Sequence, residues 1–284
     1  FECADDQEAA DALFAAAEGW LRSRGKRVVE GPMSFGVYDE IGVLLDAFDE
    51  DPFVMTVYNP PYYPRLIEAA GYRKAVDWYA FRGIAGRTDR DTDRRFYVLR
   101  ERAARNSGLT IRPVDVKRHL EREKAVISRI FADAWDRNWG HVPLSPSEFD
   151  RFAGQLKGVV VPELSLVAEV GGVPVGMTLS TYDVNVAVKK INGRLFPFGA
   201  FRLLANLKRT TRFRLILMGV LEEYRNMGIH IALIADVMRN AVRLGFTEAE
   251  MSLVVETNEP MLAVFKSVRA ERSKTYRIYG KELP

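Results

Sequence analysis

The stretch FRLILMGVLEEYRNMGIHIALIADVMRNAVRLG, residues 213–245, is the part of the chain that decides the fold. Its first part, 215–221, is a short apolar run of the kind that forms a buried strand. From Ile231 onward apolar residues recur at helical spacing, and Gly245 stands where a C-cap glycine belongs. A glycine before the helix, Gly228, lets the phosphates of a ligand approach backbone N–H groups, and the helix dipole adds to the attraction. The stretch therefore predicts a strand, a tight turn and a long helix that can bind an anion.

Residues 225–230, RNMGIH, resemble the acyl-CoA pyrophosphate loop of the GNAT (GCN5-related N-acetyltransferase) family, whose pattern is Gln/Arg-x-x-Gly-x-Gly/Ala. The order of elements around the loop, strand–loop–helix–strand–Asn–helix–strand, continues to the C-terminus as in that family. The resemblance implies an α/β protein with a mixed sheet and the acyl-CoA N-acyltransferase fold. It also implies acetyl-CoA or a longer acyl-CoA as co-substrate, with direct transfer of the acyl group to a small-molecule amine. His230 departs from the pattern, because the family prefers Gly or Ala there.

The resemblance also implies a set of donor-binding residues. In the family the strand before the loop splays from its neighbour, and its backbone pairs with the pantetheine amides, which points to Met218 and Val220 here. Asn258 matches an asparagine that begins the helix beside the pantetheine, although a helix N-cap explains the same residue equally well. The diphosphate is expected on the loop and the first helical turn, at Arg225, Asn226, Gly228, Ile229, His230 and Ile231.

His230 itself leaves three interpretations open. A histidine near an anion gains proton affinity, so it could serve as a cation for a phosphate. Its side chain could instead obstruct the space that a glycine would leave. It could also be an ordinary surface histidine in the first turn of the helix.

The catalytic residues are the least determined part of the sequence. The family often uses a tyrosine, seven residues after the helix asparagine, as the general acid, and Phe265 stands at that position. Because a phenyl ring cannot donate a proton, Tyr276 is a candidate substitute, and Glu222 at the end of the splayed strand is a candidate base. Packing and a solvated turn are the ordinary roles of these two residues. The departures leave open an alternative class, a catalytically degenerate protein that binds acyl-CoA or a partner.

The amino-acid composition argues against several other classes of protein. With 284 residues and a net charge of +3, the chain shows no excess of charge that would indicate nucleic-acid binding. One cysteine and three histidines argue against a Cys/His structural zinc site, and no paired metal-ligand motif is evident. A single cysteine, no signal peptide and no long apolar run indicate a cytoplasmic protein. Because the sequence starts at Phe1 in what reads as a strand, we expect further residues before it.

The chain divides by its pattern into three parts. Residues 109–284 carry the complete GNAT-like order, and 86–108 reads as a charged connection followed by a linker helix. Asn59 and Asn258 each precede a proline and a helix, which indicates an internal repeat. We therefore expect 1–85 to be a partial GNAT-like unit without catalytic function. A generic arrangement of helices and strands with a chance coincidence remains the alternative.

Residues 189–214 hold eight basic residues and no acid, with phenylalanine and leucine interleaved. Such a basic and aromatic segment can lie on a membrane surface or cover a long acyl chain. A solvated basic face beside a core face is the ordinary explanation. The resemblance implies an acceptor pocket after the first helix of the domain, which Trp135, Asn138 and Trp139 could line, although a tryptophan at a helix end more often packs in a core.

Overall fold

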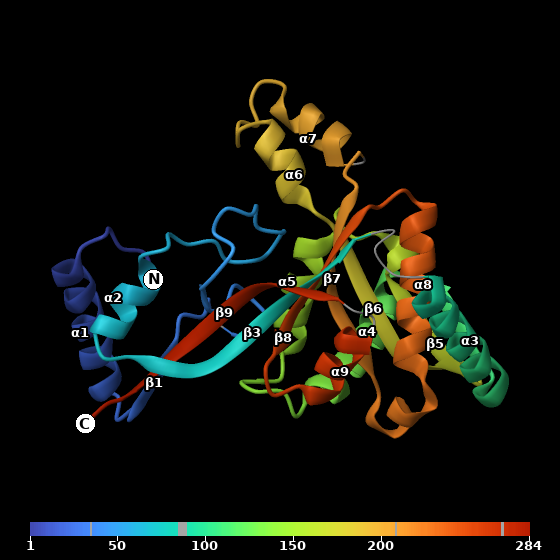
Figure 1. Cartoon of the computed structure of the whole chain (residues 1–284), viewed down its shortest axis with the longest axis horizontal. Coiled ribbons are helices and arrows are strands. Elements are labelled where there is room, and N and C mark those ends of the chain that lie inside the picture. The colour runs from blue at the N-terminus through green and yellow to red at the C-terminus, as the bar shows by residue number, and fades with distance from the viewer. Residues whose placement is uncertain (35, 85–89, 208, 268–269) are drawn as a thin grey trace. The chain divides into compact units, whose positions relative to one another are not determined.

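The computed structural model describes residues 1–34, 36–84, 90–207, 209–267 and 270–284, which form two compact units (Figure 1). The first unit contains three stretches of the chain, Phe1–Phe81, Leu253–Val264 and Arg272–Pro284. The second unit contains two, Arg82–Ser252 and Phe265–Glu271.

The two compact units do not coincide with the parts 1–85, 86–108 and 109–284 that the sequence pattern indicates. The last strand, β9 (Glu271–Glu282), pairs antiparallel with both β1 (Val28–Gly31) and β2 (Val43–Leu44). The C-terminal residues therefore complete the sheet of the N-terminal unit, and a division drawn along the sequence cannot show this.

The first unit combines the strands β1, β2 and β9 with most of β3 (Arg73–Ile84). It also contains the helices α1 (Gln7–Arg22) and α2 (Tyr63–Ala69) and the first part of α9 (Glu259–Ser267). Helix α1 begins where the Asp6 carboxylate accepts two backbone N–H bonds of the first turn. Its core is a cluster of apolar and tyrosine side chains: Val43, Tyr63, Ile67, Tyr72 and Tyr279. Asp77 on β3 accepts two hydrogen bonds from the Arg277 guanidinium of β9, at 2.8 and 3.0 Å, which fixes these strands to each other.

The second unit is built on five strands in the order β8-β7-β6-β5-β4. They are β4 (Leu109–Pro113), β5 (Leu166–Val170), β6 (Val173–Tyr182), β7 (Arg212–Val220) and β8 (Glu248–Val255). Its helices are α3 (Arg90–Ser107), α4 (Leu120–Trp135), α5 (Pro146–Leu156), α6 (Val184–Lys190), α7 (Gly199–Leu207) and α8 (Ile229–Arg243), with short 3-10 turns at Pro162–Leu164 and Glu222–Met227. Neighbouring strands are antiparallel except β7 and β8, which are parallel. This mixed sheet confirms the expected fold class.

Helices α4 and α8 cover opposite faces of this sheet. A Cβ added to Gly176 on β6 would lie 3.1 Å from a methyl of Ile229 on α8. A Cβ added to Gly219 on β7 would lie 2.5 Å from the Trp135 ring on α4. Gly176 pairs with Val220, one position beyond Gly219, and successive strand residues point to opposite faces. Trp135 therefore packs against the sheet, which is the ordinary role that the sequence left open.

Short sequence motifs account for two local features of the second unit. Ser145 and Glu148 form a capping box at the start of α5. Gly171 and Gly172 form the hairpin turn between β5 and β6, both with positive φ. Helix α3 packs along α8, and residues 86–89 of the expected connection lie outside the described ones. The basic segment, for which no helix was predicted, contains α7 and the end of α6.

Candidate functional site

Strand β7 separates from β8 partway along its length. Parallel pairing joins Arg212 to Glu248 and ends with Leu215 opposite Met251, whereas β7 continues to Val220 against β6 alone. A register shift on the β6 side leaves Ile216 as an extra residue in β7, directly after the last pair. A bulge of this kind bends a strand and ends its pairing. In the described residues the edge of β7 beyond Leu215 therefore has no strand opposite it, as the resemblance implies for the donor strand.

The turn after β7 presents backbone N–H groups. Gly228 has a left-handed conformation with φ of 74° and directly precedes α8. Within the described ranges no side chain caps α8, and a Cβ at Gly228 would meet only Ala103, at 3.8 Å. The first-turn N–H groups of Ile229, His230 and Ile231 are thus available for an anion, and the helix dipole favours one there.

The basic residue of the loop is already engaged. Arg225 donates from Nε to the carbonyl of Val220 at 3.3 Å and from Nη2 to the carbonyl of Ala134 at 3.4 Å. The guanidinium thus ties the loop to the ends of β7 and α4, and Asn226 beside it is exposed. His230 is partly buried, and burial lowers its pKa below the usual 6.5. A lowered pKa favours a neutral imidazole at pH 7 over the cationic alternative.

The sequence-predicted donor residues fall into two groups. Met218 and Val220 lie on β7 past the bulge, followed along the chain by the Gly228 turn. Asn258 belongs to the first unit, where its side-chain oxygen accepts the Met261 N–H at 3.2 Å as the N-cap of α9. The capping role of Asn258 is confirmed, and its place beside a pantetheine stays a prediction.

The two predicted catalytic residues, Glu222 and Tyr276, lie in different environments. Glu222 is exposed, forms an ion pair with Arg137 at 2.9 Å, and its backbone N–H donates to Asp133. Tyr276 belongs to the first unit and is fully buried on β9. Both observations favour the ordinary roles, although neither tests the catalytic assignment.

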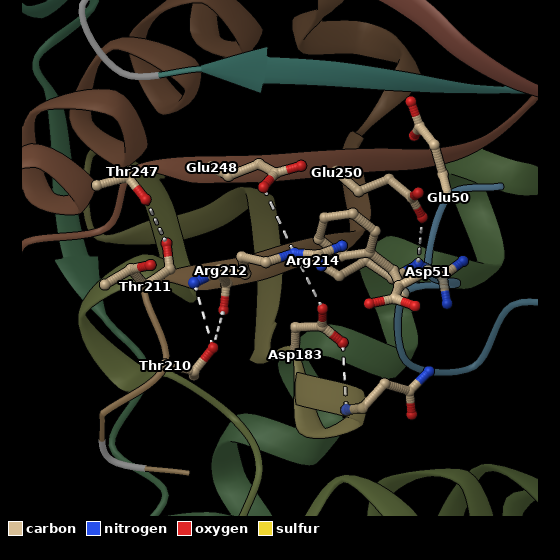
Figure 2. A network of polar contacts seen from close by, with 12 residues as sticks. Glu50, Asp51, Asp183, Thr210, Thr211, Arg212, Arg214, Thr247, Glu248 and Glu250 are labelled. Atoms are coloured by element: carbon tan, nitrogen blue, oxygen red, sulfur yellow. Dashed lines mark hydrogen bonds and ion pairs between the residues drawn. The ribbon is translucent and has the colours of Figure 1, made fainter. Parts of the chain in front are cut away.

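A buried polar network that the sequence did not reveal lies where β7 and β8 stop pairing, and Figure 2 shows two of its members, Arg214 and Glu250. Arg214 donates from Nε to the Ser252 hydroxyl at 2.8 Å, and that hydroxyl donates to Glu250 Oε1 at 2.7 Å. All three side chains are buried, and within the described part of the chain Glu250 Oε2 has no hydrogen-bond partner. Because leaving a buried carboxylate oxygen unpaired is costly, Glu250 is a candidate for a functional role.

A second ion-pair network lies next to the first on the same strands. Arg212 Nε lies 3.3 Å from Asp183 and 3.5 Å from Glu248, whose carboxylate also accepts from Arg82 at 2.6 Å (Figure 2). Arg212 and Arg214 are therefore not part of a basic surface, which corrects the reading of 189–214 as one continuous basic face. The signal in the sequence was the alternation of Glu248, Glu250 and Ser252 along an otherwise apolar strand.

Together these elements offer three kinds of contact along one strand. The open edge of β7 can pair with amide groups, the start of α8 can bind phosphate, and the Glu250 carboxylate can accept a proton. The described residues contain no group of His, Cys, Asp or Glu side chains that could hold a metal ion. Helices in the described ranges are all too short or too polar to span a bilayer. The expected cytoplasmic location stays a prediction.

Two relatives match almost the whole chain, while no family model matches it. Protein YghO of Escherichia coli is 35% identical over 287 residues, covering 98% of this chain and 72% of the relative. The bacterial ceramide synthase of Caulobacter vibrioides is 32% identical over 287 residues, covering 98% of this chain and 73% of that protein.

Solved structures of GNAT proteins share this fold. A GCN5-related N-acetyltransferase from Sphaerobacter thermophilus aligns with a TM-score of 0.54 at 17% identity, covering 95% of this chain and 67% of that one. A tandem GNAT protein from the clavulanic acid biosynthesis pathway aligns with a TM-score of 0.51 at 11% identity, covering 96% and 69%. The expected GNAT-like fold is thereby confirmed.

Proposed function

Because the chain belongs to the family of Protein YghO and the bacterial ceramide synthase and has the fold of GNAT proteins, we propose that it is an acyl-CoA-dependent N-acyltransferase with a long-chain amine as acceptor. The name of the Caulobacter relative supports this acceptor class, since a ceramide is the amide of a fatty acid with a long-chain amino alcohol. The observation that carries the proposal is the opening of β7 from β8 after Leu215, which leads to the uncapped start of α8.

The donor would lie along β7. The backbone of Met218 and its neighbours on the open edge would pair with the pantetheine amides. The N–H groups of Ile229, His230 and Ile231 would hold the diphosphate. This direction brings the thioester to the end of the β7–β8 pairing, where Arg214, Ser252 and Glu250 lie. Binding both reactants there would supply much of the rate through proximity.

Glu250 would then accept the proton of the attacking amine. The amine nitrogen forms a C–N bond to the thioester carbonyl carbon, the C–S bond breaks, and coenzyme A leaves as the thiolate. Arg214 and Ser252 hold the carboxylate in place and orient it through the hydrogen bonds from Arg214 to Ser252 and from Ser252 to Glu250. A thiol has a pKa of about 8.5, so the thiolate can leave without a strong general acid. Phe265 at the family's tyrosine position is compatible with this chemistry.

The test combines acyl-CoA donors of increasing chain length with a panel of short-chain and long-chain amines. Release of free thiol together with the matching amide, identified by mass spectrometry, supports the proposal when long-chain amines are preferred. No calorimetric binding across the acyl-CoA series would overturn it. Binding without thiol release or amide would show instead an acyl-CoA-binding protein without catalysis, the alternative that Phe265 motivates.

Glu250→Gln separates the catalytic role from the fold, because glutamine keeps a similar shape and a hydrogen-bond acceptor. The matched control is Glu123→Gln, at a buried carboxylate that pairs with Arg112 of β4 elsewhere in the same unit. Loss of thiol release in the Glu250 variant alone is the result expected from the proposal.

A further inference from the structure

The connection between β6 and β7 carries an exposed apolar surface. Helices α6 and α7 form a hairpin that stands beyond the ends of these strands (Figure 1). Phe196 is 91% exposed, Phe201 is 74% exposed and Phe198 is 66% exposed. Leu195 and Leu204 are also exposed, so five large apolar side chains face outward within ten residues. A cluster of this kind marks an interaction surface in a protein that keeps its other large apolar residues mostly buried.

These exposed side chains are not needed for the hairpin's own packing. Its interior is formed by Ala187, Ile191 and Leu207, all buried. Glycine at position 199 lets the start of α7 approach the backbone of Arg194, since a Cβ at Gly199 would lie 1.8 Å from the Arg194 carbonyl oxygen. The hairpin therefore has its own small interior in addition to the outward phenylalanines, and the ordinary explanation of a solvated basic face beside a core face does not account for them.

Basic side chains surround the same surface. Lys190, Arg194, Arg202 and Arg209 are exposed, and no carboxylate among the described residues pairs with any of them. The sequence holds no Asp or Glu between 189 and 214, so the hairpin has no acidic residue to balance this charge. The surface is thus both apolar and uniformly positive.

The base of the hairpin is held firmly on the sheet. The fully buried Asp183 caps α6 by accepting the Asn185 N–H, and it forms an ion pair with Arg212 on β7 (Figure 2). The backbone N–H of Asp183 also donates to the Arg212 carbonyl at 3.1 Å. A ligand that binds the hairpin is therefore held next to the strand that carries the candidate site.

We propose that the α6–α7 hairpin docks on an anionic lipid bilayer. Phe196, Phe198 and Phe201 insert at the boundary between headgroups and acyl chains, and the basic side chains contact the lipid phosphates. The positive charge of the hairpin surface is complementary to the negative charge of an anionic bilayer, which favours this partner. A second copy of the chain would bring the same positive surface against itself, and self-association through one patch requires self-complementarity. Membrane docking is independent of the proposed function and goes beyond it.

The test is flotation of the full-length protein with vesicles of phosphatidylcholine alone and of phosphatidylcholine mixed with phosphatidylglycerol. We expect binding to the anionic vesicles that weakens as salt is added. The triple variant Arg194→Gln/Arg202→Gln/Arg209→Gln lowers the partition coefficient roughly fivefold for each charge removed. The triple variant Phe196→Ser/Phe198→Ser/Phe201→Ser abolishes flotation.

Matched controls change the same residue types elsewhere on the surface. Leu13→Ser/Val142→Ser/Val242→Ser removes three exposed apolar side chains, and Lys26→Gln/Lys157→Gln/Arg243→Gln removes three exposed charges. Both controls bind as the unchanged protein does if the hairpin is the docking element. Equal losses in the controls and the hairpin variants would overturn the assignment to the hairpin.

A second measurement covers the case in which a triple variant folds poorly. Phe196→Trp keeps an aromatic side chain, and its added fluorescence shifts to shorter wavelength with anionic vesicles if the ring enters the bilayer. Negligible flotation of the unchanged protein with both vesicles overturns the proposal. The proposal is also overturned if light scattering shows that the unchanged protein is a dimer and that the triple phenylalanine variant is a monomer. These measurements use no acyl-CoA and no amine, so their failure leaves the proposed function standing.

Discussion

Arg214 on β7 donates a hydrogen bond of 2.8 Å from Nε to the hydroxyl of Ser252 on β8, beside the last paired residues of the two strands. The same Ser252 hydroxyl donates a hydrogen bond to the Glu250 carboxylate, so it connects a buried arginine and a buried glutamate. Such a network is stabilising only when its members stay together, because removing one leaves a buried charge unpaired. This position, at the end of the parallel pairing, is where the proposed reaction needs a proton acceptor.

Glu250→Gln is expected to lower kcat about a hundredfold or more, since a positioned base contributes at least that much, while KM for acyl-CoA changes little. Steady-state thiol release measures both constants, and circular dichroism checks that the variant is folded. The control Glu123→Gln keeps its kcat. An unchanged kcat in Glu250→Gln would exclude the carboxylate as the base.

Gly228→Ala tests the donor loop. The left-handed conformation at this position costs a residue with a Cβ about 1 kcal/mol, and shifting the turn displaces the N–H groups of Ile229 and His230. The variant is expected to bind acyl-CoA at least tenfold more weakly in calorimetry.

Gly245→Ala is the matched control for this change. Gly245 stands at the other end of α8 with φ of 80°, so the same strain arises there away from the donor loop. Denaturant unfolding should show similar losses of stability in the two variants, with acyl-CoA affinity reduced only at Gly228. Equal affinities would contradict the assignment of the loop.

Gly219→Ala is expected to destabilise the second unit by about 1–3 kcal/mol, because a methyl group there overlaps the Trp135 ring and the Ala134 methyl in a packed core. Chemical denaturation measures this loss of unfolding free energy. Gly154→Ala makes the same chemical change in helix α5, where the added methyl meets nothing within 4 Å. That control is expected to be neutral or slightly stabilising, and a similar loss in both variants would argue against the contact between α4 and β7.

His230 predicts a pH dependence of stability. Its pKa in the folded protein is lowered by burial from the usual 6.5, and unfolding restores the usual value. Below about pH 6.5 the unfolded chain therefore takes up the proton first, so stability that is complete above this pH declines as the pH falls toward the folded-state pKa. His230→Gln removes this contribution, and its unfolding free energy should fall less between about pH 7 and about pH 5. Parallel curves for the two proteins would refute the prediction.

Much of the local structure follows from the sequence alone. Gly228 and Gly245 bound helix α8, Ser145 and Glu148 start α5, and Asn258 caps α9. Each of these features depends on residues a few positions apart, so short-range hydrogen bonds and backbone preferences decide it. The strand, turn and helix of 213–245, and the fold that they indicate, can likewise be predicted from the sequence.

The rest was decided by contacts between segments far apart in the chain. Tyr276 reads as a strand residue in the sequence, but the pairing of β9 with β1 and β2 places it, fully buried, in the first unit. Arg212 and Arg214 read as surface charges, and they turn inward because the register of β7 with β8 sets them beside Glu248 and Glu250. The sequence by itself determined which residues form a strand, a turn or a helix, because neighbouring residues control those choices. Only the tertiary structure decided which charged side chains are buried together, because burying a charge is favourable only where strand pairing brings its partner into reach.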